Sequence, residues 1–379
     1  MARETYRIAV LAGDGIGPEV MSPALEVLDA ARAAVGGFEL EIEPLEAGAA
    51  LDRRTGVAFP EATFARAAAA DAILLGAMGL PSVRKADGTE IAPQLDLRER
   101  LELYAGLRPV RALRGLPLPL ADPRAREIDL VFVRESTEGL FAARGKTVLD
   151  GDRAARDTMV ITRPASERLF HAAFRLARRR KAAGRPGRVT CVDKANVLGA
   201  FAFFRGIFDE VARLYPDVRA DHLYVDAMGL NLVKRPWAFD VVVTENMFGD
   251  ILSDVGAALM GGMGFAPSGD VGDAHAVFQP CHGSAPDIAG QGKANPTATL
   301  LSVAMMLEWL AERHRSAPCA QAARLIAAAV EGAFADGDLL PFELGGSAGT
   351  AAIAGRVLHR LSREDVWREA EVAPLAGRG

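Results

Sequence analysis

The chain of 379 residues has few cysteines and no apolar run long enough for a membrane helix. Its three cysteines, Cys191, Cys281 and Cys319, are odd in number and far apart, which excludes a readable disulfide framework or CxxC metal site and favours a reducing cytoplasm. Uncharged stretches such as 255–269 and 294–307 fall short of the roughly 18–20 residues that span a bilayer. We therefore expect a cytoplasmic protein without a membrane partner.

The sequence also lacks an excess of positive charge. Forty-four Lys and Arg against 49 Asp and Glu give a net charge of −5, which argues against nucleic acid as the main partner. The basic run 175–188 is interpreted as the solvated end of a helix, where cations complement the helix dipole. Any binding site for an anion must therefore be assembled locally. The length favours two domains or one large α/β unit.

Short apolar runs rich in β-branched residues alternate with amphipathic stretches along the chain, which predicts an α/β fold. A polar segment, 142–157, has little periodicity and is predicted to be a loop or protruding arm. The Pro- and Arg-rich passage 108–126 and the Gly-rich passage 261–272 are candidates for crossings between domains. The predicted strands are 7–12, 72–76, 129–134, 189–192 and 240–244, and the predicted helices are 19–35, 164–183, 201–214 and 295–313.

Acidic residues follow two strand-like runs. In 239–254 an apolar strand leads into a helix start, with Asp250 and Asp254 four residues apart and therefore on one helical face. Their repulsion would be relieved by Mg²⁺ or Mn²⁺, which prefer hard oxygen ligands. The alternative is an N-cap role for Asp250 and a solvated Asp254. Asp226, after the run 222–225, taken alone is equally a helix cap.

Cationic residues supply the complementary chemistry. Lys194 lies just past a buried strand, where it could act as a general base, although a surface lysine is the alternative. Arg98, Arg108 and Arg134 could hold carboxylates bidentately, or each could pair with a neighbouring acid.

Two Gly-rich segments are candidate nucleotide sites. The turn 13–19 has the spacing G-x-G-x-G, not that of the dinucleotide fingerprint, so we interpret it as a turn suited to close approach by a ligand. The loop 280–296 could hold an adenosine, and Asp287 could accept hydrogen bonds from ribose hydroxyls and repel a 2′-phosphate, which favours NAD over NADP. An ordered structural loop is the alternative.

Taken in order, eight segments resemble the β-decarboxylating dehydrogenases of the isocitrate/isopropylmalate dehydrogenase family, most closely the 3-isopropylmalate enzymes. The resemblance implies an α/β, non-Rossmann, two-domain fold with a cleft between the domains. It implies a cofactor domain of residues 1–106 plus 261–379, and a substrate, metal and dimerisation domain of residues 107–260. The segments are 13–19, 98–109, 134–139, 192–198, 225–228, 248–254, 282–296 and 344–350.

The resemblance also implies a site shared between the subunits of a homodimer. Arg98, Arg108 and Arg134 would hold the carboxylates of a small hydroxy acid, with Gln94 and Leu95 beside them. The catalytic residues would be Lys194, which accepts the hydroxyl proton, and Asp226, both from the neighbouring subunit. Mg²⁺ or Mn²⁺ would be bound by Asp250 and Asp254 together with the neighbour's Asp226. The residues expected to contact NAD are His282, Gly283, Ser284, Ala285, Asp287, Ile288 and Asn295.

Two departures from the family pattern bear on the substrate. Phe141 stands where the family usually has a tyrosine whose hydroxyl helps to protonate the enol formed after decarboxylation. Ile91 and Leu95 suit an alkyl substituent, whereas Gln94 suits a hydroxyl or carboxylate. The alternatives are therefore a D-malate, tartrate or homoisocitrate dehydrogenase, or a catalytically weak regulatory paralogue.

Overall fold

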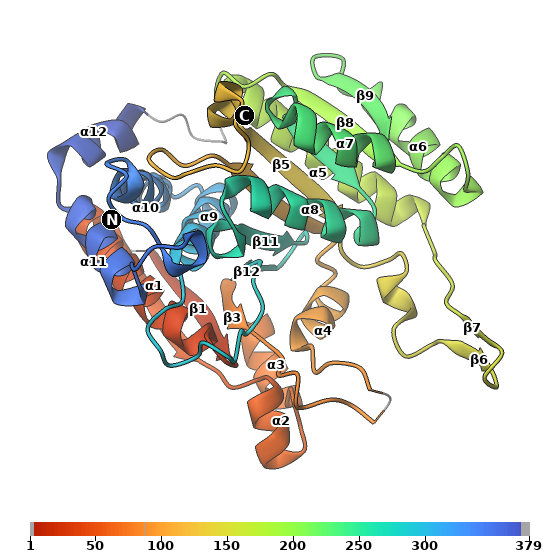
Figure 1. The fold of residues 1–379 in the computed structure, drawn as a ribbon, viewed down its shortest axis with the longest axis horizontal. Helices are drawn as coiled ribbons and strands as arrows, with labels where there is room; N and C mark the ends of the chain where they lie inside the picture. The colour runs from red at the N-terminus through yellow and green to blue at the C-terminus, as the bar shows by residue number, and fades with distance from the viewer. Residues whose placement is uncertain (1–3, 87, 373–379) are drawn as a thin grey trace.

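The computed structural model describes residues 4–86 and 88–372, and one large sheet with helices on both faces dominates it (Figure 1). The described strands form a ten-stranded sheet in the order β2-β1-β3-β12-β11-β4-β5-β10-β8-β9. Strand β11 is antiparallel to both β12 and β4, β4 is antiparallel to β5, and the other pairs are parallel. The strands are β1 (Glu4–Gly13), β2 (Phe38–Pro44), β3 (Ala72–Ala77), β4 (Ala105–Arg111), β5 (Asp129–Glu135), β8 (Arg188–Asp193), β9 (Arg219–Tyr224), β10 (Val241–Thr244), β11 (Pro267–Val271) and β12 (Ala276–Pro280).

The helices follow the strands in the alternation that the apolar pattern predicts. They are α1 (Gly17–Val35), α2 (Ala49–Thr55), α3 (Glu61–Ala68), α4 (Pro93–Arg100), α5 (Arg163–Ala182), α6 (Gly199–Ala212), α7 (Val225–Lys234), α8 (Asn246–Met260), α9 (Thr297–His314), α10 (Ala317–Phe334), α11 (Thr350–Leu361) and α12 (Glu364–Val372). No helix within the described ranges is both long and apolar enough to cross a membrane.

The predicted strands and helices are all present, as β1, β3, β5, β8 and β10 and as α1, α5, α6 and α9. Strands β2, β4, β11 and β12 are not among the predicted strands. Strand β4 contains a proline and two arginines, and β11 contains proline, glycine and aspartate, so neither presents the apolar β-branched run that marks a buried strand.

Side chains alternate between the two faces of the sheet at its centre. Val110 and Phe132 belong to the same apolar cluster as Leu252 of α8, and we call this side the front face. Val131 and Val133 pack with α5 on the opposite side, the back face. Arg108 lies two residues before Val110 on β4, and Arg134 lies two residues after Phe132 on β5. Residues two apart on a strand point to the same face, so both arginines lie on the front face.

The segment 142–157 projects from the body, as predicted, and contains the short antiparallel hairpin of β6 (Val148–Asp150) and β7 (Ala154–Arg156) (Figure 1). The prediction for the basic run 175–188 is wrong at one residue. The side chain of Arg180 is only 11% exposed, and its guanidinium pairs with Asp129 and Asp240 at 2.9 and 2.5 Å. A cation at this point therefore ties α5 to the sheet.

Candidate active site

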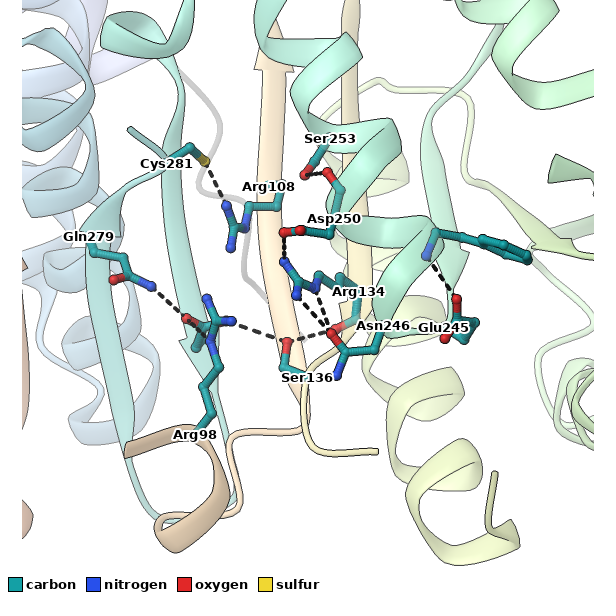
Figure 2. Close-up of polar contacts among 12 residues, drawn as sticks. Arg98, Arg108, Arg134, Ser136, Glu245, Asn246, Asp250, Ser253, Gln279 and Cys281 are labelled. Carbon is teal, nitrogen blue, oxygen red and sulfur yellow. Dashed lines mark hydrogen bonds and ion pairs between the residues drawn. The ribbon is translucent and has the colours of Figure 1, made fainter. Parts of the chain in front are cut away.

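Three arginines converge on one region of the front face (Figure 2). Arg98 comes from α4, Arg108 from β4 and Arg134 from the end of β5, and all three are buried. Burial, followed by the charges of Arg98 and Arg108, lowers the pKa of Arg134 to about 10. The Arg108 Nη1 atom also donates a hydrogen bond to the sulfur of Cys281 at 2.9 Å. The fold thus concentrates positive charge where solvent cannot screen it.

Asp270 on β11 is the buried counter-charge, and it is not among the site residues predicted from the sequence. Its carboxylate accepts hydrogen bonds from Arg98 Nε at 3.0 Å and from Gln279 Nε2 at 2.9 Å. Burial alone would raise the pKa of Asp270, but the three arginines outweigh burial and lower it. The signal was weak because a single aspartate in a short strand of small residues has no motif spacing.

Arg134 is held by two residues of α8. The side-chain oxygen of Asn246 accepts hydrogen bonds from Arg134 Nε at 3.0 Å and Nη2 at 2.8 Å, and Asp250 forms an ion pair with the same guanidinium. Gly249 permits this approach, because a Cβ atom there would lie 2.6 Å from Arg134 Cγ. The N-cap of α8 is Glu245, whose carboxylate accepts from the Phe248 N–H at 2.8 Å, so the alternative N-cap role for Asp250 is wrong.

The candidate metal ligands divide into two groups. Asp250 and Asp254 lie one turn apart on α8, and burial followed by repulsion from Asp250 raises the pKa of Asp254. Asp226, in the first turn of α7, instead forms an ion pair with Lys194. No three His, Cys, Asp or Glu side chains in the described part of the chain form a group able to hold a metal ion, so Asp226 does not join the other two within one chain. Carboxylate oxygens fit Mg²⁺ or Mn²⁺, which would replace Arg134 and Lys194 as their partners.

A pocket of about 140 Å³ adjoins the arginines. Leu95, Arg98, Phe141 and Asn246 are among the residues that line it. The ring of Phe141 lies 5.1 Å from the guanidinium carbon of Arg134, so residue 141 does stand at the arginine cluster. Gln94 is not among the lining residues, and its side-chain oxygen is buried without a hydrogen-bond partner among the described residues.

The loop after β12 presents unpartnered polar groups. His282 Nδ1 lies 2.9 Å from the Gly283 carbonyl oxygen, while its Nε2 is buried and has no partner in the described ranges. Burial lowers the pKa of His282, which favours the neutral imidazole. The Asp287 carboxylate is exposed and makes no hydrogen bond to the described residues. These orphaned groups fit contact with a polar cofactor.

Other residues predicted to contact the cofactor have structural partners. Ser284 is buried and its hydroxyl donates to the Gly79 carbonyl oxygen, while Ala285 and Ile288 pack on an apolar cluster under the loop. The Asn295 amide donates to Glu343 at 2.5 Å. Of the seven residues predicted to contact the cofactor, His282, Gly283 and Asp287 are therefore the most available for binding it.

The glycines of the turn 13–19 lie close to the protein's own backbone, and the interpretation of this turn as suited to close approach by a ligand stays a prediction. A Cβ atom on Gly15, which has a φ of +57°, would lie 1.9 Å from the Ser284 carbonyl oxygen. Glu19 then accepts a hydrogen bond from the Gly290 N–H at 2.9 Å. The turn and the first turn of α1 thus fix the loop that carries His282.

Comparisons with known proteins agree with the fold and the motifs. A family model described as isocitrate/isopropylmalate dehydrogenase matches residues 7–357. The 3-isopropylmalate/3-methylmalate dehydrogenase of Methanocaldococcus jannaschii is 43% identical over 95% of this chain and 100% of its own. The isocitrate/homoisocitrate dehydrogenase of Thermus thermophilus is 43% identical over 94% of this chain and 98% of its own. The solved isocitrate dehydrogenase of Methylococcus capsulatus has a TM-score of 0.81 at 36% identity and covers 94% of this chain and 100% of its own. These matches confirm the predicted resemblance and fold class.

Proposed function

The chain belongs to the isocitrate/isopropylmalate dehydrogenase family, and we propose on this premise that it catalyses the NAD-dependent and divalent-metal-dependent oxidation of a 2-hydroxy di- or tricarboxylic acid, with β-decarboxylation. The observation that carries the proposal is the buried cluster of Arg98, Arg108 and Arg134 beside the carboxylates of α8. Burying three guanidinium groups is costly unless anions pair with them. Asp270 pairs with Arg98 and Asp250 with Arg134, whereas Arg108 has no carboxylate partner among the described residues. A substrate with two or three carboxylates supplies the remaining negative charge.

The residues of the site have distinct roles in this proposal. Arg98, Arg108 and Arg134 bind and orient the substrate carboxylates, and Leu95 contacts an alkyl substituent, which favours a 3-isopropylmalate-like acid. The partner's Lys194 accepts the hydroxyl proton as the alcohol becomes a ketone. Gln94 does not line the pocket, so the proposal gives it no direct contact with substrate.

Carboxylates on α8 and polar groups of the loop after β12 would bind the two cofactors. Asp250 and Asp254 would hold Mg²⁺ or Mn²⁺ together with Asp226 of the partner subunit, and His282 and Asp287 would contact NAD. When bound, NAD⁺ accepts the hydride and the ion stabilises negative charge on the substrate oxygens. Asp287 favours NAD over NADP because its carboxylate would repel a 2′-phosphate.

A homodimer is part of the proposal because one chain does not assemble the three aspartates. Helices α7 and α8, which carry the three aspartates, have exposed apolar side chains that support a dimer interface. Leu230 and Val233 of α7 and Ile251 of α8 are 57–59% exposed, and a face of this kind suits an isologous contact with a second copy. We assign residues 1–106 and 261–379 to the cofactor domain and residues 107–260 to the domain that dimerises. The three free cysteines would remain reduced in the cytoplasm.

The test is a substrate panel with NAD⁺ and Mn²⁺. Malate, tartrate, 3-isopropylmalate, isocitrate and homoisocitrate are each supplied, and NADH and CO₂ are measured separately. We expect both products with 3-isopropylmalate and no activity after the metal is chelated. NADH and CO₂ from another acid of the panel would replace the substrate assignment, and silence with all five acids while NADH still binds would favour a regulatory paralogue.

A further inference from the structure

A groove of about 780 Å³ lies on the back face, and residues of α5 and α9 form two of its walls. Leu107 and Pro109 of β4 and Val131 of β5 contribute to its floor. These residues alternate with Arg108 and its neighbours, whose side chains lie on the front face. The groove and the arginine cluster therefore occupy opposite faces of the same strands, and the groove has a volume typical of small-molecule sites.

The two walls of the groove carry opposite charges. Helix α5 presents Arg175 and Arg179, four residues apart, and α9 presents Glu308 and Glu312, also four residues apart. Each pair therefore lies one turn apart on its helix. One contact joins the walls, between Arg179 Nε and Glu312 Oε1 at 3.3 Å. Arg175 and Glu308 form no hydrogen bond or ion pair with any residue in the described ranges.

The ionised form of the Glu308 carboxyl group lacks a partner that would stabilise its charge. Burial, and then the charge of Glu312, raise the pKa of Glu308 to about 7, although Arg179 and Arg324 act in the opposite direction. A cationic group in the groove would stabilise the ionised carboxylate. An anionic group would likewise pair with Arg175 on the opposite wall.

We propose that this groove binds a free α-amino acid with an apolar side chain. The ammonium group faces Glu308 and Glu312, the carboxylate faces Arg175 and Arg179, and the side chain covers the apolar floor at Leu107. A ligand with one charge would leave one wall uncompensated, which is why the zwitterion is favoured. Bound there, the amino acid contacts α5 and α9 at once, on the opposite face of the strands that carry the substrate arginines.

The test uses three compounds that share an aliphatic chain but differ in charge. L-Norleucine carries both groups, hexanoate lacks the ammonium group, and pentylamine lacks the carboxylate. Isothermal titration of the full chain should show one norleucine bound per chain, and binding of the other two weaker by at least about tenfold. No binding of norleucine at millimolar concentrations, or equal binding of a singly charged compound, would overturn the proposal. The titration needs neither NAD⁺ nor a hydroxy acid, so its outcome is independent of the dehydrogenase assignment.

Variants locate the site. Glu308→Gln and Arg175→Gln should each weaken norleucine binding by about tenfold. Arg178→Gln is the matched control, because Arg178 lies on the same helix, does not line the groove and pairs with Asp217 at 3.0 Å. Arg175 is exposed and unpaired among the described residues, so its replacement leaves the fold intact. Unchanged norleucine binding in Arg175→Gln, or equal loss in Arg178→Gln, would show that the ligand does not occupy this groove.

Discussion

At the scale of single residues, replacing Phe141 tests the proposed decarboxylation separately from oxidation. Its ring lies beside Arg134 and lines the small pocket at the arginine cluster, so a hydroxyl added there would reach the site. We predict that Phe141→Tyr accelerates CO₂ release. The acceleration should be at most roughly 10²–10⁴-fold, which is the typical contribution of a general acid. The measurement compares rates of CO₂ and NADH formation in one reaction.

Phe141→Leu is the control for this prediction, because it removes the ring without adding a proton donor. It should leave the ratio of CO₂ to NADH at or below that of the unmodified enzyme. If Phe141→Tyr also leaves the ratio unchanged, the missing hydroxyl does not limit the reaction in this enzyme.

Glu308 predicts an unusual dependence of stability on pH. The pKa of this carboxyl in the folded protein is raised to about 7 from 4.5, so its contribution to stability is complete below about pH 4.5 and is lost as the pH rises through about 7. Glu308→Gln should therefore raise the free energy of unfolding by roughly 1–3 kcal/mol at about pH 8 and by little at about pH 5.

Urea unfolding at the two pH values measures this difference. Glu364→Gln is the control, because the Glu364 side chain is 91% exposed and its replacement should change stability little at either pH. A gain in Glu308→Gln that is equal at both pH values would contradict the assignment, because it would not depend on ionisation.

At the scale of elements, α8 depends on close packing against the sheet. A Cβ atom on Gly256 would lie 2.6 Å from Val110 Cγ2 and 3.1 Å from Phe132 Cε2. We predict that Gly256→Ala destabilises the protein by about 1–3 kcal/mol and weakens activity, because α8 also carries Asp250 and Asp254.

Gly206 in α6 provides the matched comparison. A Cβ atom there meets no atom of the described residues within 4 Å, so Gly206→Ala should stabilise the protein by about 0.5–1 kcal/mol through helix propensity alone. Thermal unfolding of both variants separates the effects. Equal shifts of the two melting temperatures would indicate that α8 can move away from β4 at little cost.

An element is predictable from the sequence where it carries a periodic or apolar signal. Strand β10 and the start of α8 are predictable because an apolar run precedes acidic residues at helical spacing. Elements and residues whose place depends on tertiary contacts are not predictable in this way. Strand β11 has little β propensity, and Asp270 is identifiable only because the fold brings it to Arg98. In the same way, the glycines of the turn 13–19 serve backbone packing that no local pattern reveals.

At the scale of the whole molecule, the proposed site is divided between two chains. Lys194 and Asp226 form one pair at the ends of β8 and β9, and Asp250 and Asp254 form another on α8. Because these two pairs are separated within one chain, experiments that combine two variants in one dimer can test whether a site uses both chains. Variants that each lack a different half of the site should complement each other in a dimer.

We predict that Asp226→Asn and Asp254→Asn are each inactive alone and regain activity when coexpressed. If the subunits associate at random, about half of the dimers are hybrids, and each hybrid has one site with both aspartates intact, so activity should recover to about a quarter of the unmodified level. Different affinity tags on the two variants isolate the hybrids and prove that they formed. Purified hybrids without activity would mean that each site is built within one chain, because only then does every site in the hybrid lack one of the two aspartates.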